Sequence, residues 1–350
     1  MIDFRSDTLT KPSAGMRRAM AEAEVGDEQY REDPTVNRLQ EMAAELTGKE
    51  AALFVPSGTM CNAIAFAVHC RPGDAVILER RAHPNIAEGG GPAIFASVMM
   101  RGLEGERGVF TAEQVRSYLS NRGTHTSKSA MISVENTSNQ GGGKIWPLET
   151  LAGLRALCDE AGMKLHMDGA RLMNASVGSD TPVSVIASYP DSVWIDLSKG
   201  LGAPVGAVIA GSAEFIEEGR LWKHRLGGAM RQAGIIAAAG IYAFEHNVER
   251  LAEDHENAKV LAEGIGNVPG IELLRTPVET NIVIFSVANT GMSAVEFAQI
   301  MREEHGVAMS PYIDPLTIRA VTHLDVNRDD CMKGIAAVHA TATTGQLKVN

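Results

Sequence analysis

The chain has 350 residues, 45% of them hydrophobic and 21% charged, and its formal net charge at pH 7 is −11. This composition is ordinary for a globular protein, and the length allows two or more domains. A nucleic-acid-binding protein usually carries a dense run of lysine and arginine, and this sequence has none. Its most apolar segment, Ala233 to Phe244, is shorter than the about 20 residues that cross a bilayer. We therefore expect neither a nucleic-acid partner nor a membrane span.

The beginning of the sequence lacks the apolar stretch of a secretory signal. The four cysteines are scattered and form no Cys-x-x-Cys pair. This pattern predicts reduced thiols in a cytoplasmic protein, and it gives no reason to expect a metal site.

Short apolar runs alternate with helical patterns through the first two thirds of the chain. The predicted strands are Ala51–Val55, Ala75–Leu78, Ala130–Val134, Lys164–Met167, Ser192–Leu197 and Ala207–Ala210. The predicted helices between them are Met60–His69, Ala112–Leu119, Leu148–Ala161 and Ala213–Trp222. Because these strands are apolar without alternation, they suit a sheet that is buried on both faces. This alternation of strands and helices predicts an α/β fold, with a mostly parallel sheet between two layers of helices.

A long helical pattern over Ala233–Ile265 separates this region from a smaller α+β pattern. The smaller pattern has predicted strands near Glu272–Leu274, Asn281–Val287 and Ile318–Val321, and predicted helices near Ala294–Glu304 and Arg328–Thr341. We expect a large α/β domain over residues 1–245, with an arm over residues 1–25 that is free to pack elsewhere, and a small α+β domain over residues 246–350.

Two predicted strands end in side chains that suit cofactor chemistry. Lys199 follows the strand Ser192–Leu197 in a turn rich in glycine, where an amine can be fixed for a Schiff base. Asp168 follows the strand Lys164–Met167, where a carboxylate can pair with a protonated pyridine nitrogen and make the ring a better electron sink. Taken singly, a surface lysine and an aspartate that caps a helix are the simpler interpretations. Their places at the ends of successive strands favour a joint role.

Further candidates follow other predicted strands. Ser57-Gly58-Thr59 opens a helix, where free N–H groups suit a phosphate, although the same residues make an ordinary cap. His83 follows the second strand and is placed to stack on a cofactor ring or to lie in a plain loop. His125, in a polar loop, has the pattern of a surface histidine. Arg319, inside a strand pattern, faces either solvent or a substrate carboxylate.

Together these motifs resemble the low-specificity L-threonine aldolases of the β-eliminating lyase group, which are pyridoxal phosphate enzymes of the aspartate-aminotransferase fold type. The resemblance is collinear over nearly the whole chain. It rests on Phe4-Arg5-Ser6-Asp7-Thr8, Asp33-Pro34-Thr35-Val36-Asn37-Arg38-Leu39, Ser57-Gly58-Thr59-Met60, Glu135-Asn136-Thr137, Asp168-Gly169-Ala170-Arg171, Leu197-Ser198-Lys199-Gly200-Leu201-Gly202, Gly227-Gly228-Ala229-Met230-Arg231-Gln232, Glu253-Asp254-His255 and Val321-Thr322-His323-Leu324-Asp325. It implies fold type I, with a mostly parallel sheet of the seven-stranded type flanked by helices.

The resemblance also implies residue roles. Those toward the cofactor are Lys199 for the Schiff base, Asp168 at the pyridine nitrogen, Arg171 near the phenolic oxygen, Gly58 and Thr59 at the phosphate, His83 stacked on the ring, and Arg231 reaching the phosphate of a neighbouring subunit. Those toward the substrate are Ser6 and Arg319 at its carboxylate, Arg171 beside them, His125 at its β-hydroxyl, and Tyr30 at the mouth of the site toward the partner. Either His83 or His125 would act as the base.

The activity implied is reversible cleavage of the Cα–Cβ bond of an L-β-hydroxy amino acid, such as L-threonine or L-allo-threonine, to glycine and an aldehyde. A homodimer or homotetramer with shared sites is implied as well. Two alternatives stay open. The same fold supports β-elimination, racemisation or transamination of an amino acid. A protein that binds pyridoxal phosphate without catalysis is the other.

The sequence departs from the family pattern on the substrate side. Ser138 stands where the family usually has histidine, and Arg31 stands where it usually has glycine. Arg80 and Arg81 precede His83. If Arg31 points inward, it would favour a negatively charged β-substituent, and a surface position is the alternative.

Overall fold

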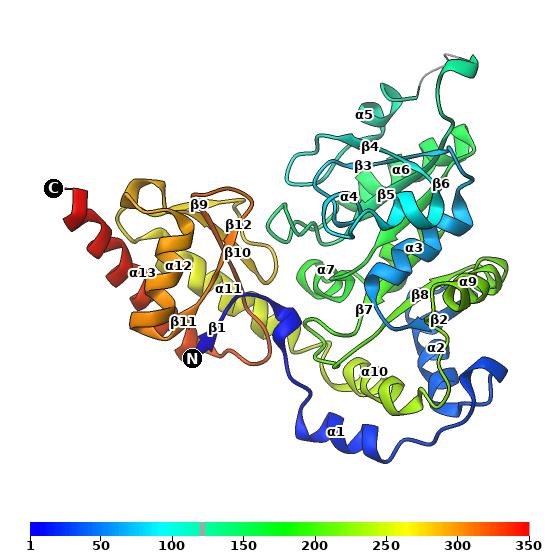
Figure 1. The fold of residues 1–350 in the computed structure, drawn as a ribbon, viewed down its shortest axis with the longest axis horizontal. Coiled ribbons are helices and arrows are strands. Elements are labelled where there is room, and N and C mark those ends of the chain that lie inside the picture. The colour runs from blue at the N-terminus through cyan, green and yellow to red at the C-terminus, as the bar shows by residue number, and fades with distance from the viewer. Residues whose placement is uncertain (120–122, 350) are drawn as a thin grey trace.

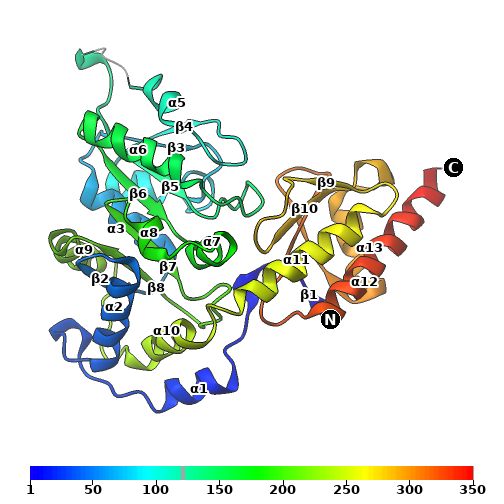
Figure 2. The same ribbon diagram turned by 180° about the vertical axis from the view of Figure 1, so that it is seen from behind.

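A computed structural model describes residues 1–119 and 123–349. This part of the chain forms a larger and a smaller lobe that lie side by side (Figure 1). Seen from behind, α11 (Leu251–Gly266) runs from the larger lobe into the smaller one (Figure 2). Among the described residues, none of the helices has both the length and the apolar character that a membrane crossing needs.

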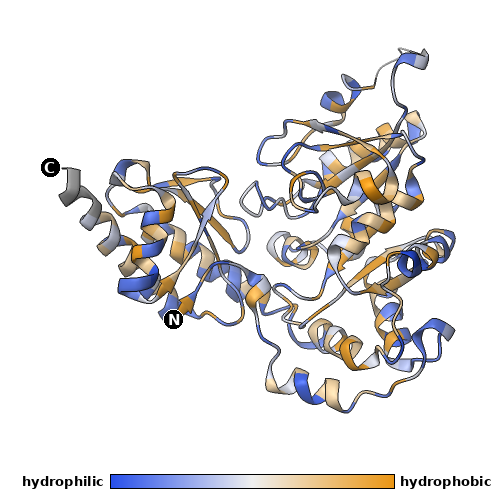
Figure 3. Ribbon diagram, in the orientation of Figure 1, coloured by the Kyte–Doolittle hydropathy of each residue, from blue (hydrophilic) through white to orange (hydrophobic). Residues whose placement is uncertain are grey.

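The described part of the larger lobe is built on a seven-stranded sheet. Its strands, in order across the sheet, are β2 (Ala51–Val55), β8 (Ala207–Gly211), β7 (Ser192–Asp196), β6 (Lys164–Asp168), β5 (Ser129–Glu135), β3 (Ala75–Glu79) and β4 (Met99–Leu103). β8 runs antiparallel to both of its neighbours, and the other adjacent pairs are parallel. The central strands are buried and strongly hydrophobic (Figure 3). The predicted fold, including the mostly parallel seven-stranded sheet, is confirmed.

Strand β4 is absent from the predicted pattern. It is an edge strand, and Met99 and Gly102 are exposed. Its Met-Met-Arg-Gly-Leu sequence therefore lacks the continuous apolar run of a strand that is buried on both faces.

The described helices of the larger lobe cover both faces of this sheet, apart from α1, which packs on α10. They are α1 (Ala14–Ala21), α2 (Pro34–Thr47), α3 (Gly58–His69), α4 (His83–Ile86), α5 (Ala112–Arg116), α6 (Leu148–Ala161), α7 (Leu172–Ser179), α8 (Val183–Ala187), α9 (Ala213–Arg225) and α10 (Gly234–His246). The four predicted helices correspond to α3, α5, α6 and α9. Helix α3 begins two residues earlier than expected because the Ser57 hydroxyl accepts a hydrogen bond from the N–H of Met60.

The prediction of one long helix over Ala233–Ile265 is wrong. The helix is interrupted between α10 and α11. Asn247 is the C-cap of α10, and α11 begins at Leu251. The side-chain amide of Asn247 donates a hydrogen bond to the carbonyl of Leu201, 2.7 Å away, in the turn that follows Lys199. Asn247 thus supports the turn that contains Lys199. The apolar periodicity of the sequence gives no sign of this tertiary contact.

The smaller lobe packs helices α11, α12 (Ala294–His305) and α13 (Arg328–Val349) against an antiparallel sheet. The order of the described strands is β12 (Ser310–Tyr312), β13 (Thr317–Val321), β10 (Ile282–Ser286) and β9 (Glu272–Leu274). The predicted strands and helices of this region are confirmed. The structure adds two features that were not predicted. They are β12 and the pairing of β1 (Ile2–Asp3) with β11 (Val307–Ala308).

The two lobes have separate hydrophobic cores. Leu251, at the start of α11, belongs to the core of the larger lobe, whereas Ala258 belongs to that of the smaller lobe. Phe4 is fully buried in the smaller core, although α1 packs on α10 of the larger lobe. The start of the chain therefore spans both lobes. The domain boundary at residue 245 stays a prediction.

The sheet topology explains where chemistry can gather. Parallel strands carry their carboxyl ends to one edge of a sheet. Glu135, Asp168 and Asp196 end β5, β6 and β7 at that edge. β2 also runs parallel to β7, since both are antiparallel to β8, so Ser57 and the start of α3 lie at the same edge.

Candidate active site

A cavity of about 440 Å³ lies at this edge of the sheet. Among the described residues, it brings together eight of those predicted for the site, namely Ser6, Gly58, Thr59, His83, Asp168, Arg171, Lys199 and Arg319. They come from the N-terminal arm, from loops at four strand ends and from β13 of the smaller lobe. The cavity is therefore completed by both lobes.

Lys199 is held on a well-supported turn after β7. Its Nζ donates to Oδ2 of Asp196 at 2.6 Å and lies 5.6 Å from the centroid of the Trp194 ring. Oδ1 of Asp196 accepts from both the N–H and the hydroxyl of Ser198, each at 2.8 Å. The Thr10 hydroxyl donates to the backbone carbonyl of Lys199. These contacts fix the amine at the cavity wall, as a covalent anchor requires.

Asp168 is a buried carboxylate, and its hydrogen-bond donors among the described residues are neutral amides. Oδ2 accepts from Asn62 Nδ2 at 2.9 Å, and Oδ1 accepts from the N–H of Ala170 at 3.1 Å. Burial, followed by the nearby carboxylate of Glu135, raises the pKa of Asp168 to about 7. A cationic pyridine nitrogen would supply the counter-charge that this carboxylate lacks. The site therefore fits pyridoxal phosphate at this position.

The start of α3 fits the phosphate end of the same cofactor. Gly58 and Thr59 are its first residues, and N–H groups in a first helical turn have no intrahelical partner. A Cβ atom added to Gly58 would lie 2.3 Å from the Trp194 ring, so only glycine fits between the helix and the indole. The close approach seats the helix start directly against the cavity.

His83 is oriented by a buried carboxylate. Its Nδ1 lies 2.9 Å from Oε1 of Glu88, whose side chain is only 1% exposed. The hydrogen bond to Glu88 raises the pKa of His83. Because Glu88 accepts at Nδ1, the neutral imidazole keeps Nε2 as its free acceptor. The histidine is thus prepared to take up a proton on one defined nitrogen.

Asn62 joins the pair of His83 and Glu88 to Asp168. Its Nδ2 donates to Oε1 of Glu88 at 2.7 Å as well as to Asp168. Its Oδ1 lies 2.9 Å from Nε1 of Trp194 and 3.1 Å from Nε2 of His166. The amide orientation is therefore determined, because the indole can only donate. One side chain of α3 thus holds both Glu88 and Asp168 in place.

Arg171 and Asp7 form a buried ion pair behind the cavity. Nε and Nη2 of Arg171 each donate to Asp7 at 2.7 Å, and Asn281 of the smaller lobe donates to the same carboxylate at 3.1 Å. Burial alone would raise the pKa of Asp7, but the Arg171 charge outweighs it and holds that pKa well below its usual range. The pair fastens the N-terminal arm to the sheet edge.

Arg319 presents a guanidinium from the smaller lobe. Nη1 donates to Oδ1 of Asn139 at 3.1 Å, and Nη2 donates to the carbonyl of Arg5 at 3.1 Å. The group stacks 4.7 Å above the Tyr312 ring. Its Nε is buried and has no hydrogen-bond partner within residues 1–119 and 123–349. This geometry suits a carboxylate ligand.

Three predicted site residues lie outside the cavity in the single chain. Tyr30 is 72% exposed, Arg231 pairs with Asp27 on the surface, and His125 is exposed in a short 3₁₀ turn. Arg31 does not point inward. It donates to Glu217 at 2.5 Å on the surface, which favours the alternative that it is a surface residue.

Several lining residues were not predicted, namely Glu88, Glu135, Asn139, Trp194 and Asp196. Glu135 directly follows the predicted strand Ala130–Val134, and Asp196 is the last residue but one of the predicted strand Ser192–Leu197, so their positions were available from the pattern. Glu88 and Asn62 lie within or beside helices, where a polar side chain gives no sign that it faces a cavity.

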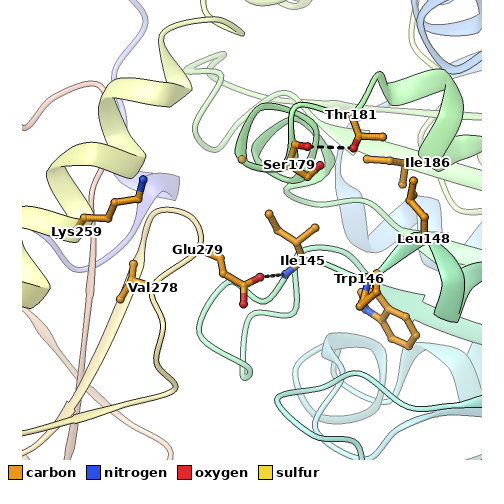
Figure 4. Close-up of a pocket in the computed structure, with 11 residues that line it drawn as sticks. Ile145, Trp146, Leu148, Ser179, Thr181, Ile186, Lys259, Val278 and Glu279 are labelled. Carbon is orange, nitrogen blue, oxygen red and sulfur yellow. Dashed lines mark hydrogen bonds between the residues drawn. The ribbon is translucent and has the colours of Figure 1, made fainter.

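A second cavity, of about 450 Å³, lies between the lobes (Figure 4). Its two charged side chains among the described residues already have partners: Lys259 pairs with Glu256 and Glu279 pairs with Lys144. The hydroxyl of Thr181 donates to the backbone carbonyl of Ser179. We assign no chemical role to this second cavity.

Asp7→Ala is expected to lower the free energy of unfolding by about 3–5 kcal/mol, because it leaves the buried charge of Arg171 without its partner. Urea titration measures this quantity. Asp3→Ala is the matched control, since its pair with Arg5 is partly exposed and is worth about 0–1 kcal/mol. Equal losses in the two variants would contradict the role given to Asp7.

The chain was compared with known proteins. The beta-eliminating lyase family matches residues 3–290. The chain is 40% identical over 330 residues to the low specificity L-threonine aldolase of Escherichia coli K12, covering 94% of this chain and 96% of that protein. It is 39% identical over 333 residues to low-specificity L-threonine aldolase 1 of Arabidopsis thaliana, covering 94% and 93%.

The structure of a threonine aldolase from Leishmania major has the same fold. It superposes with a TM-score of 0.82 at 20% identity and covers 100% of both chains. The family match spans most of the chain, and the two relatives each match 94% of it. The chain therefore belongs to the beta-eliminating lyase family.

Proposed function

We propose that this protein uses pyridoxal phosphate, the cofactor of its family, to cleave the Cα–Cβ bond of an L-β-hydroxy amino acid, giving glycine and an aldehyde. The observation that carries the proposal is one cavity lined by Lys199, by Arg319 and by Asp168, a buried carboxylate with no cationic hydrogen-bond partner among the described residues. The relatives named L-threonine aldolases support the reaction, and L-threonine, L-allo-threonine or a related amino acid is the proposed substrate.

In this proposal Lys199 would hold the cofactor covalently, Asp168 would pair with its pyridine nitrogen, and the N–H groups of Gly58 and Thr59 would hold its phosphate. His83 would contact the ring. When bound, the cofactor supplies a cationic ring that accepts the electron pair of the broken Cα–Cβ bond. Asp168 supports this role because an adjacent carboxylate favours the protonated nitrogen.

Arg319 is the proposed clamp for the substrate carboxylate, with Ser6 beside it. Asn139 holds Nη1 of Arg319 and also lies 3.4 Å from Nη1 of Arg171. A guanidinium fixed in this way binds the two carboxylate oxygens in one orientation. The clamp would set the Cα–Cβ bond perpendicular to the cofactor ring, which is the orientation that cleavage needs.

His83 is the proposed base. Glu88 fixes Nδ1, so Nε2 is free to take the proton of the substrate's β-hydroxyl as the carbonyl of the aldehyde forms. His125, the other predicted base, lies outside the cavity of the single chain. Within one chain, the geometry therefore favours His83.

We also propose a homodimer or homotetramer with shared sites. Tyr30 and Arg231, which the resemblance directs toward a partner, are exposed in the single chain. Leu9, Val25 and Ile235 are exposed apolar residues of the N-terminal region and α10, as an interface requires.

The four cysteines, all in the described part, are free and buried, which supports a reducing, cytoplasmic setting.

The reaction is tested by incubating the cofactor-loaded protein with a panel of β-hydroxy amino acids and quantifying the products by NMR. Glycine and aldehyde are expected in equal amounts. Lys199→Ala should abolish their release, and Lys164→Ala, a change at an exposed lysine, should leave it unchanged. A keto acid and ammonia in place of glycine would identify an eliminase and refute the proposal.

Glu88→Gln is expected to move the acid limb of the kcat/KM profile to lower pH. The base must be neutral, and loss of the Glu88 charge lowers the pKa of His83, so the neutral form persists at lower pH. Asp168 and Glu135 remain, so the shift is partial. The decrease in kcat/KM should stay below that of His83→Ala, for which loss of a general base costs about 10²–10⁴-fold. An unmoved acid limb would exclude His83 as the titrating base.

A further inference from the structure

A separate polar hollow of about 120 Å³ lies near the cavity. Arg81, Arg107 and Arg275 are among the residues that line it. Arg81 follows β3 and Arg107 follows β4, both in the larger lobe, and Arg275 follows β9 in the smaller lobe. Three arginines from distant segments thus line one small space.

The positive charge in this hollow is only partly compensated. Arg107 donates through Nε to the carbonyl of Gly141 and through Nη1 to Glu279, but its Nη2 is buried with no partner in the described residues. The guanidinium groups of Arg81 and Arg275 form no ion pair within that part of the chain. Burial, together with the charge of Arg275, lowers the pKa of Arg107.

Two carboxylates also line the hollow, and both are engaged. Glu79 accepts from the N–H of Arg81 at 2.5 Å, and Glu104 pairs with Arg80 at 2.7 Å. Burial raises the pKa of Glu79. The three arginines therefore outnumber the two carboxylates in the lining, and one of these carboxylates already pairs with Arg80.

The backbone is unusual at two of the arginines. Arg107 has φ 51° and Arg275 has φ 59°, in the left-handed region that favours glycine. A non-glycine residue adopts this region at a cost in steric strain. Strain of this kind persists where a local function or the surrounding structure requires it. Both strained arginines line the same hollow.

We propose that this hollow binds a small oxyanion of the inorganic phosphate or sulfate type, held by Arg81, Arg107 and Arg275. Guanidinium groups match such oxygens with paired hydrogen bonds. The hollow is much smaller than the cavity of about 440 Å³ at the sheet edge, so it suits a compact free anion better than a larger phosphate ester. Nη2 of Arg107 would gain its missing partner.

The bound anion would connect the lobes beside the active site. Gln140 lines the hollow and follows Asn139, which holds Arg319, and Arg107 bonds the same loop at Gly141. An anion that draws Arg275 toward Arg81 and Arg107 would steady that loop. Resting on the proposed function, we expect phosphate to lower KM for the amino acid, because Arg319 holds the substrate carboxylate, and to leave kcat little changed.

The site is tested by calorimetric titration of inorganic phosphate into the cofactor-loaded protein at constant ionic strength. Glycine is kept saturating so that the carboxylate clamp at Arg319 is filled. One saturable site per chain is expected. Arg81→Gln and Arg275→Gln should each weaken binding at least tenfold. Arg116→Gln, which removes the same charge from an exposed ion pair with Glu160, should not change it.

Failure to bind in the parent, or equal weakening in the Arg116 variant, would overturn the proposal. Glycerol phosphate forms a second arm, and binding as tight as that of inorganic phosphate would overturn the assignment of a free anion. Calorimetry does not depend on turnover. A protein that binds phosphate but cleaves no amino acid would therefore refute the proposed function and leave the anion site intact.

Discussion

The ion pair between Asp7 and Arg171 is the contact on which the site depends. It joins the N-terminal arm to the end of β6, and Asn281 ties the same carboxylate to the smaller lobe. Three segments that are distant in sequence thereby meet at one buried charge pair. Since a buried pair is costly to break on one side only, each segment is held in register by the other two. Ser6 and Arg319 reach the cavity through this arrangement.

The electrostatics of the cavity follow from the sheet. Carboxylates at the ends of β5, β6 and β7 gather in a confined space, and Glu88 adds another. Such a cluster is unfavourable unless cations or hydrogen-bond donors accompany it. Lys199 donates to Asp196, His83 pairs with Glu88, and Asn62 donates to both Glu88 and Asp168. Glu135 accepts from the backbone N–H groups of His83 and Asn139, so Asp168 and Glu135 both lack a cationic partner at hydrogen-bond distance within the described chain. A pyridinium nitrogen would provide that partner for Asp168.

Much of this architecture could be predicted from local sequence. Buried parallel strands read as apolar runs, so Lys199 and Asp168 could be placed at strand ends and hence at one edge of the sheet. The edge strand β4 lacked that signal, and the break at Asn247 arises from a tertiary contact with Leu201. Asn62 and Glu88 were missed because their function depends on which side of a helix or loop meets the cavity. The predicted partner-facing roles of Tyr30 and Arg231 require a second subunit and stay predictions.

The central claim is that Lys199 anchors the cofactor. Borohydride reduction of the cofactor-loaded protein makes such a linkage permanent, and peptide mass spectrometry then locates it. The added mass is expected on the peptide that contains Lys199 and on no other lysine. Labelling of a different lysine, such as the buried Lys223, or no labelled peptide at all, would contradict it.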